Sequence, residues 1–241
     1  MEKSVFKFKV EPRYVDFTDR VSVSSICDLI LQAAGRDAHR RGFGIDALAD
    51  NNYGWVLSRL AIEMDYMPTQ YSEFTLHTWI SDYNRLSSTR NFTLTDNEGR
   101  EFGRAVSQWC MIDYATRMPV DMNTMAKAHD GNMVDAPAPC ERPRRIGVVT
   151  SEPVIEHTVV YSDIDFNRHV NTLRYIEMMF DAFPIELFET NNGMRIDVNF
   201  IAEARYGETL VAGYIKEDNV WQFEIKTDSD KVLCRSKIEF K

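Results

Sequence analysis

Apolar positions along the chain form two helical patterns, each followed by a group of strand-like runs. Between residues 21 and 41, apolar side chains recur at spacings of three and four, which predicts an amphipathic helix that ends at Gly42. Its stripe comprises Val23, Ile26, Cys27, Ile30, Ala33, Ala34 and Ala38. A second helix is predicted after Asn171, a natural N-cap, and Pro184 ends or kinks it. Its stripe comprises Leu173, Ile176, Met179, Phe180 and Phe183.

Runs rich in β-branched and aromatic residues follow both helices in equal number and in the same order. The first group comprises residues 55–64, 73–80, 90–95 and 101–113, and the second comprises residues 195–202, 208–215, 220–227 and 232–240. Short polar loops join several of them (residues 96–99, 217–219 and 228–230), and such loops make the joined strands antiparallel. The pattern predicts an α+β fold in which an antiparallel sheet curls around a helix, twice in one chain.

A proline-rich stretch separates these halves. Pro137, Pro139 and Pro143 fall within seven residues, so this stretch is neither a regular helix nor a central strand. We predict a linker over residues 136–150 between one unit at residues 1–135 and a second at residues 151–241.

The two halves also align with each other. DFTDRVS at residues 16–22 falls on DFNRHVN at residues 165–171, as an internal duplication would produce. The first copy lacks the Asn and the His. That asymmetry favours a functional role for the second copy, although drift would produce it as well.

The second copy carries the candidate chemistry. Asp165, Asn167 and His169 lie at two-residue intervals, so in an extended segment their side chains would face one side. Such a row can hold an imidazole in one tautomer and position a water or a carbonyl. Asp163 and Arg174, close by, are expected to be plain surface residues.

The start of the second predicted helix adds a possible anion site. Free N–H groups at a helix N-terminus favour negative charge, so those of Val170, Asn171 and Thr172 would form an oxyanion hole if they faced a carbonyl. The alternative is that Asn171 caps the helix and does nothing more. Glu203 lies in an otherwise apolar strand end, where a partly desolvated carboxylate suits a general base. A solvent-facing rim position explains it equally well.

Composition narrows the function classes. A net charge of −9 disfavours nucleic acid as the general partner, and no apolar run reaches the ~18 residues of a membrane helix. Residues 1–10 lack the apolar run of a signal peptide. The scattered Cys27, Cys110, Cys140 and Cys234 form no CxxC, which argues against zinc and disulfides and favours the reduced cytoplasm. We expect no metal or cofactor, and structural or exposed roles for His39, His77, His129 and His157.

Together these motifs resemble the acyl-acyl-carrier-protein (acyl-ACP) thioesterases of plants and bacteria. The resemblance covers nearly the whole chain and rests on residues 55–59 leading into Ile62-Glu63, residues 103–117, residues 165–171 with Tyr175, and Glu203. It implies a double hotdog fold and hydrolysis of the thioester between a fatty acyl chain and the phosphopantetheine arm of ACP. It places the acyl chain mainly in the first unit and the catalytic groups, Asp165, Asn167, His169 and Glu203, in the second.

One departure from the family pattern bears on mechanism. Many plant members have a Cys directly after the Glu, where this chain has Ala204, so carboxylates and a water are the expected chemistry. On this hypothesis, the helix start at residues 170–172 polarises the thioester carbonyl, Asn167 orients the substrate or water, and His169 and Glu203 share acid and base duty. Asp165 either orients His169 or attacks the carbonyl to give a transient anhydride.

The implied partner sets a further expectation. ACP is acidic, so docking to this acidic chain needs a local positive surface. The candidates are Arg40 and Arg41 at the end of the first helix and Arg142, Arg144 and Arg145 in the linker, although such clusters are usually only solvated surface. Two rival functions stay open: an acyl-CoA thioesterase of the same fold, and a non-catalytic acyl-binding module. The sequence leaves monomer and homodimer both possible.

Overall fold

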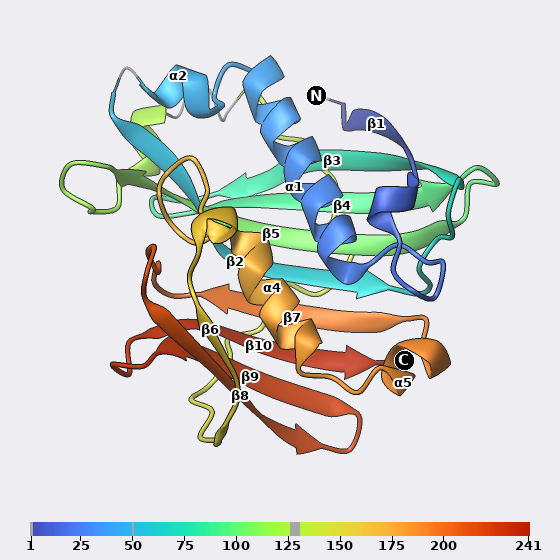
Figure 1. The fold of residues 1–241 in the computed structure, drawn as a ribbon. Coiled ribbons are helices and arrows are strands. Elements are labelled where there is room, and N and C mark those ends of the chain that lie inside the picture. Colours follow the sequence, from blue (N-terminus) through green and yellow to red (C-terminus); the bar gives the residue numbers. More distant parts are fainter. Residues whose placement is uncertain (1, 50, 126–130) are drawn as a thin grey trace. The chain divides into compact units, whose positions relative to one another are not determined.

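The computed structural model describes residues 2–49, 51–125 and 131–241, so His129 lies outside the described residues. The chain divides into two compact units, Met1–Pro143 and Arg144–Lys241. Each unit sets one long helix against an antiparallel sheet (Figure 1), as the hydrophobic pattern predicts. None of the helices in the described part of the chain is long and apolar enough to cross a membrane.

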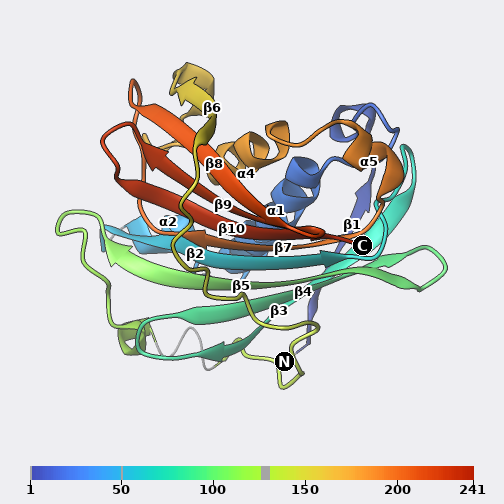
Figure 2. The ribbon, with the colours of Figure 1, turned by 90° about the horizontal axis from the view of Figure 1, so that it is seen from below.

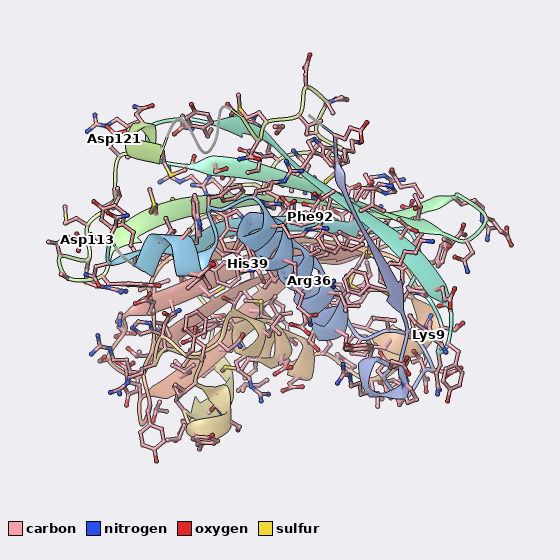
Figure 3. The ribbon with its side chains drawn as sticks, turned by 90° about the horizontal axis from the view of Figure 1, so that it is seen from above. Lys9, Arg36, His39, Phe92, Asp113 and Asp121 are labelled. Carbon is pink, nitrogen blue, oxygen red and sulfur yellow. The ribbon has the colours of Figure 1, made fainter. Side chains whose placement is uncertain are left out.

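In the first unit, α1 (Val23–Arg40) packs against a sheet with the strand order β1-β3-β4-β5-β2. The strands are β1 (Ser4–Lys9), β2 (Tyr53–Met64), β3 (Glu73–Tyr83), β4 (Ser88–Asp96) and β5 (Glu101–Asp113), with short helical elements at Pro12–Tyr14, Ile45–Ala49 (α2) and Met122–Met125. Side chains alternate across each strand, so Phe74, Leu76, Phe92 and Leu94 are buried. Figure 3 shows Arg36 and His39, both exposed, on the helix that crosses the sheet carrying Phe92.

The second unit repeats this plan on a smaller scale. Helix α4 (Thr172–Asp181) lies against a sheet with the order β7-β10-β9-β8-β6, as Figures 1 and 2 both show. The elements are β6 (Pro153–Thr158), a 3₁₀ turn (Tyr161–Asp163), α5 (Glu186–Thr190), β7 (Met194–Phe200), β8 (Thr209–Glu217), β9 (Val220–Thr227) and β10 (Val232–Phe240). Beyond the end of α4, Phe183 packs its ring on Trp221, Phe223 and Phe240 with centroids 5.3–5.4 Å apart.

Most predicted elements are confirmed. The helix expected between residues 21 and 41 runs from Val23 to Arg40, and three predicted strands (101–113, 220–227 and 232–240) have the expected bounds. Asn171 caps α4 as predicted, with its Oδ1 accepting the Leu173 N–H at 2.9 Å.

The proline-rich segment contains no helix or strand, as expected, but its end is fixed to the second sheet. Asp197 Oδ1 accepts the Arg144 N–H at 2.9 Å, and Asn199 Oδ1 accepts the Ile146 N–H at 3.1 Å. Asn199 also donates to the Arg144 carbonyl at 2.9 Å. These side chains project from the face of β7 that does not carry the buried apolar residues. They are themselves buried because residues 144–146 cover them.

A charged cluster is buried under the last turns of α1. The Asp37 carboxylate, 1% exposed, contacts Arg90 Nη1 at 2.6 Å and Arg41 Nε at 2.7 Å, and it accepts a hydrogen bond from Ser4. Burial by itself would raise the pKa of Asp37. The Arg90 charge and the hydrogen bonds outweigh it and hold that pKa below its usual value. An ionised cluster is therefore buried between α1 and the sheet.

Candidate functional site

The segment that carries the candidate residues is a tight turn closed by a bridge between Ile164 and Val170. Asp165 donates its N–H to the His169 carbonyl at 2.9 Å, and its Oδ1 accepts the N–H groups of Asn167 at 2.8 Å and His169 at 3.2 Å. Arg168 takes a left-handed conformation with φ 65°. The prediction that Asp165, Asn167 and His169 form an extended row is therefore wrong. The Asp165 carboxylate accepts backbone N–H groups of the same segment, and these hydrogen bonds close the segment into a turn.

The turn brings His169 against Glu203. His169 Nε2 lies 3.2 Å from Glu203 Oε2, with the two side chains 13% and 33% exposed. Glu203 follows the end of β7, so this contact joins the helix start to the far end of a strand. The sequence left two alternatives for Glu203, a partly buried general base or a solvent-facing rim residue, and its partial exposure lies between them. Asn167 and Asp165 are half-buried in the same turn.

Three hydrogen bonds hold the backbone around Glu203. Its carbonyl accepts from Lys231 Nζ at 2.6 Å, and the next carbonyl, of Ala204, accepts the Val170 N–H at 2.9 Å. The Ala204 N–H donates to the hydroxyl oxygen of Tyr175 at 3.1 Å. Tyr175, to which the sequence assigns no role, is 4% exposed and therefore anchors the Glu203 segment to α4.

The expected oxyanion donors are only partly available. The Val170 N–H is bound to the Ala204 carbonyl, and the Asn171 N–H donates to the Asp163 carbonyl at 2.7 Å. The prediction of free oxyanion donors is therefore wrong for Val170 and Asn171. An isolated helix end would leave these N–H groups free, but here they bind carbonyl groups of other chain segments. Within the described residues, Thr172 is the one predicted donor whose N–H no carbonyl engages.

The expectation that Asp163 is a plain surface residue is wrong. Asp163 is 4% exposed, not on the surface, and its Oδ2 accepts the Val160 N–H at 2.7 Å and lies 2.7 Å from His157 Nε2. Arg174 Nε approaches its Oδ1 at 3.4 Å. Burial would raise the pKa of Asp163, but the hydrogen bonds from Val160 and His157 hold it below the usual value. The Asp163 carboxylate thus fixes the segment that directly precedes the turn.

The first unit contains the same turn, which confirms the internal repeat. A bridge joins Val15 to Val21, Asp16 donates its N–H to the Arg20 carbonyl at 2.9 Å, and Asp16 Oδ1 accepts the Thr18 N–H at 2.8 Å. Asp19, at φ 59°, has the left-handed conformation of Arg168. Asp16 thus occupies the place of Asp165.

The repeat extends to the strand end that carries Glu203. The Val21 N–H donates to the Pro68 carbonyl at 2.9 Å, just as Val170 donates to Ala204, so Met67 falls at the position of Glu203. In the first unit, Thr18, Arg20 and Met67 therefore replace Asn167, His169 and Glu203. Arg20 Nε donates to Thr18 Oγ1 at 2.9 Å, and Met67 is buried. Only the second copy combines an imidazole with a carboxylate.

Three of the thiols are poor nucleophiles. Burial raises the pKa of Cys27 to about 12 and also raises the pKa values of Cys110 and Cys234. Because the thiolate is the reactive form, these cysteines are structural. Ala204, beside Glu203, is fully buried and offers no thiol.

The arginines expected to bind a carrier protein are mostly engaged elsewhere. Arg41 belongs to the Asp37 cluster, Arg142 lies 3.5 Å from Asp82, and Arg144 lies 3.9–4.0 Å from Asp197 and Glu239. Arg40 stacks over the Phe6 ring at 4.5 Å, and Arg145 is exposed.

Comparison with known proteins decides the family. Residues 3–127 match the acyl-ACP thioesterase N-terminal domain, and residues 149–241 match the acyl-ACP thioesterase C-terminal domain. The chain belongs to the acyl-ACP thioesterase family. One solved structure similar to this chain is that of an acyl-ACP thioesterase from Bacteroides thetaiotaomicron. It is 40% identical with a TM-score of 0.92, and the match covers 99% of this chain and 98% of that one.

More distant relatives agree on the fold. The 12:0-ACP thioesterase from Umbellularia californica, 17% identical, has a TM-score of 0.87 over 99% of this chain and 97% of that one. The double hotdog fold is thereby confirmed. Among curated relatives, an oleoyl-acyl carrier protein thioesterase of Arabidopsis thaliana is 25% identical over 85% of this chain and 61% of its own length. An acyl-[acyl-carrier-protein] hydrolase of Cuphea viscosissima is 27% identical over 71% of this chain and 43% of its own length. The match thus spans less than two thirds of either relative.

Proposed function

We propose that this protein hydrolyses the thioester of fatty acyl-ACP to a free fatty acid and ACP, as a step of fatty acid biosynthesis. Membership of the acyl-ACP thioesterase family supports this function. The observation that carries it is the 3.2 Å approach of His169 Nε2 to Glu203 Oε2, in the one copy of the repeated turn that has both groups.

The proposed mechanism uses this pair on a water molecule. Glu203 and His169 remove a proton from water, and the oxygen attacks the thioester carbonyl. The tetrahedral intermediate then collapses, its C–S bond breaks, and the protonated member of the pair returns the proton to the departing thiolate. The Asn167 side chain and the Thr172 N–H would donate to the oxyanion. The unit at residues 151–241 would thus be catalytic, the unit at residues 1–135 would hold the acyl chain, and residues 136–150 would link them.

Asp165 is better explained as a positioning residue than as a nucleophile. Its Oδ1 holds two backbone N–H groups of the turn, one of them on His169. Asp16 makes the corresponding bond to Thr18 in the copy that has no imidazole. The carboxylate is therefore explained by the shape of the turn alone.

Asp165→Asn should consequently keep most of the activity. The amide retains the accepting oxygen, so a weakened hydrogen bond costs ~1 kcal/mol and kcat falls by less than about tenfold. Asp165→Ala, which removes the acceptor, should lose more, and Asp16→Asn serves as the matched control in the other unit. Steady-state kcat on one acyl-ACP decides the point. If Asp165→Asn were as inactive as His169→Ala, Asp165 would be the nucleophile.

A substrate panel tests the function itself. Acyl-ACPs of varied chain length should release free thiol at rates above those for acyl-CoA with the same acyl chains. Faster turnover of acyl-CoA would identify an acyl-CoA thioesterase. Tight acyl-ACP binding without turnover would identify a non-catalytic binding module.

The cellular context is part of the same proposal. We expect the protein to act in the cytoplasm without binding nucleic acid or membranes, and fractionation of the source cells would test this. Sedimentation of the purified chain would separate the monomer from the homodimer.

A further inference from the structure

Three basic residues lie near the His169–Glu203 pair. Arg168 directly precedes His169, Arg205 follows Glu203 by two positions, and Lys231 Nζ reaches the Glu203 carbonyl at 2.6 Å. Three basic side chains thus lie close to the candidate site of a chain whose net charge is −9. Such a patch attracts an acidic partner and raises the rate of encounter.

The Arg168 and Arg205 side chains are exposed and form no ion pair with any described residue. Glu208 accepts the backbone N–H of Arg205, not its guanidinium. Lys231 Nζ donates to the Glu203 carbonyl oxygen. Of the five arginines that the sequence suggested for docking, Arg41, Arg142 and Arg144 are paired with carboxylates, Arg40 stacks on the Phe6 ring, and Arg145 is exposed.

Arg168 also adopts an unfavourable backbone conformation. Its φ of 65° lies in the left-handed region, where Asn, Asp and Gly are best tolerated and other residues are disfavoured. The equivalent residue of the first unit is Asp19, one of the favoured types. The turn of the second unit thus presents a long cationic side chain where the first unit presents a short anionic one.

Aromatic side chains complete the surface. An open cavity of about 570 Å³ lies beside the turn and is lined by Tyr161, Ser162, Ile164, Asp165, Phe166, Arg168 and Tyr206. Tyr161, Phe166 and Tyr206 are 89%, 71% and 70% exposed. Exposed Tyr and Phe beside Arg is the composition of a protein interface, since these residues are enriched there.

We propose that Tyr161, Phe166, Arg168, Arg205 and Tyr206 form the docking surface for the acidic carrier protein. This surface would bind the acidic carrier protein beside the candidate site. The inference rests on the proposed function and specifies how that function selects its carrier. It also replaces the docking sites expected at the end of α1 and in the linker.

The test is charge reversal at the two unpaired arginines. Arg168→Glu/Arg205→Glu should lower kcat/KM on acyl-ACP by about tenfold or more at low salt, and the remaining rate should depend little on salt. Hydrolysis of acyl-pantetheine, which has the same thioester but neither protein nor phosphate, should be unchanged. The matched control is Lys7→Glu/Lys9→Glu, which makes the same change in charge at exposed positions of β1 and should alter neither rate.

The other outcomes oppose the proposal. Equal losses on acyl-ACP and acyl-pantetheine would show that the arginines serve the chemistry, and unchanged acyl-ACP turnover would show that they serve nothing here. Equal losses on acyl-ACP and acyl-CoA, with acyl-pantetheine spared, would assign them to the phosphate of the arm.

Direct binding of holo-ACP, measured by calorimetry, separates this inference from the proposed function. If the wild type proves inactive on every thioester but binds holo-ACP, loss of that binding in the double variant supports the docking surface alone. Binding that the double variant retains, or that the wild type lacks, refutes it.

Discussion

His169→Ala is expected to reduce kcat on acyl-ACP by ~10²–10⁴, the contribution typical of one general acid–base group. The imidazole is the partner of Glu203 at 3.2 Å, and alanine leaves the backbone bonds of the turn in place. The measurement is thiol release at saturating substrate, with circular dichroism to verify folding. His39→Ala is the control, because His39 is exposed on α1 and pairs only with Asp46 among the described residues.

Glu203→Gln extends this result. It preserves the shape of the side chain but removes its capacity to take a proton, so a similar loss in kcat is expected. Because the two groups act as a unit, the double variant His169→Ala/Glu203→Gln should be little worse than either single one. Losses that multiplied in the double variant would mean that the groups act independently, and full activity in both single variants would exclude this site.

Asp37→Ala is expected to destabilise the protein by ~3–5 kcal/mol, because it leaves the buried Arg90 guanidinium without its counter-charge. Urea denaturation at pH 7 measures the loss. Asp28→Ala, on the same helix, removes only an exposed contact to Gln32 and should cost little. The apolar pair Asp37→Leu/Arg90→Met should recover part of the stability, since it removes the two most deeply buried charges together, although Arg41 loses its Asp37 partner.

The effect of Asp37 should also depend on pH in a defined direction. Its pKa is lower in the folded state than in the unfolded state, so its contribution to stability is complete above the unfolded pKa of ~3.9. That contribution is lost as the pH falls through the folded pKa. The difference between wild type and Asp37→Ala should therefore be constant from pH 7 to about 5 and shrink below pH 4. A constant difference down to pH 2 would contradict the ionised pair.

The regular elements could be predicted because their signals are local. The alternation that gives β5, β9 and β10 their bounds and the spacing that gives α1 its length reflect which side chains face the core. The turn was harder, because an extended segment and a side-chain-capped turn share the same polar composition. Its repeated Asp, two residues before Thr18 and Asn167, is the signal that was available.

Tertiary pairing could not be predicted in this way. Nothing local indicates that Val170 donates to Ala204, or that Arg90 on β4 pairs with Asp37 on α1. Asp37 and Asp163 are polar in sequence and buried in the fold because their counter-charges come from other elements. The candidate site residues could therefore be proposed from the sequence, but their arrangement and the hydrogen-bond donors and anchoring residues around them could not.

The repeated turn also bears on the ancestry of the chain. Its hydrogen bonds, its left-handed residue and its strand-end contact recur in both units with no insertion or deletion within residues 15–22 and 164–171. The backbone of the loop thus accommodates Thr18, Arg20 and Met67 in the first unit and Asn167, His169 and Glu203 in the second. Substitutions alone, without insertions or deletions in these segments, are enough for the copies to diverge here. A gene that once encoded two equal halves could therefore specialise them without any loss of the fold.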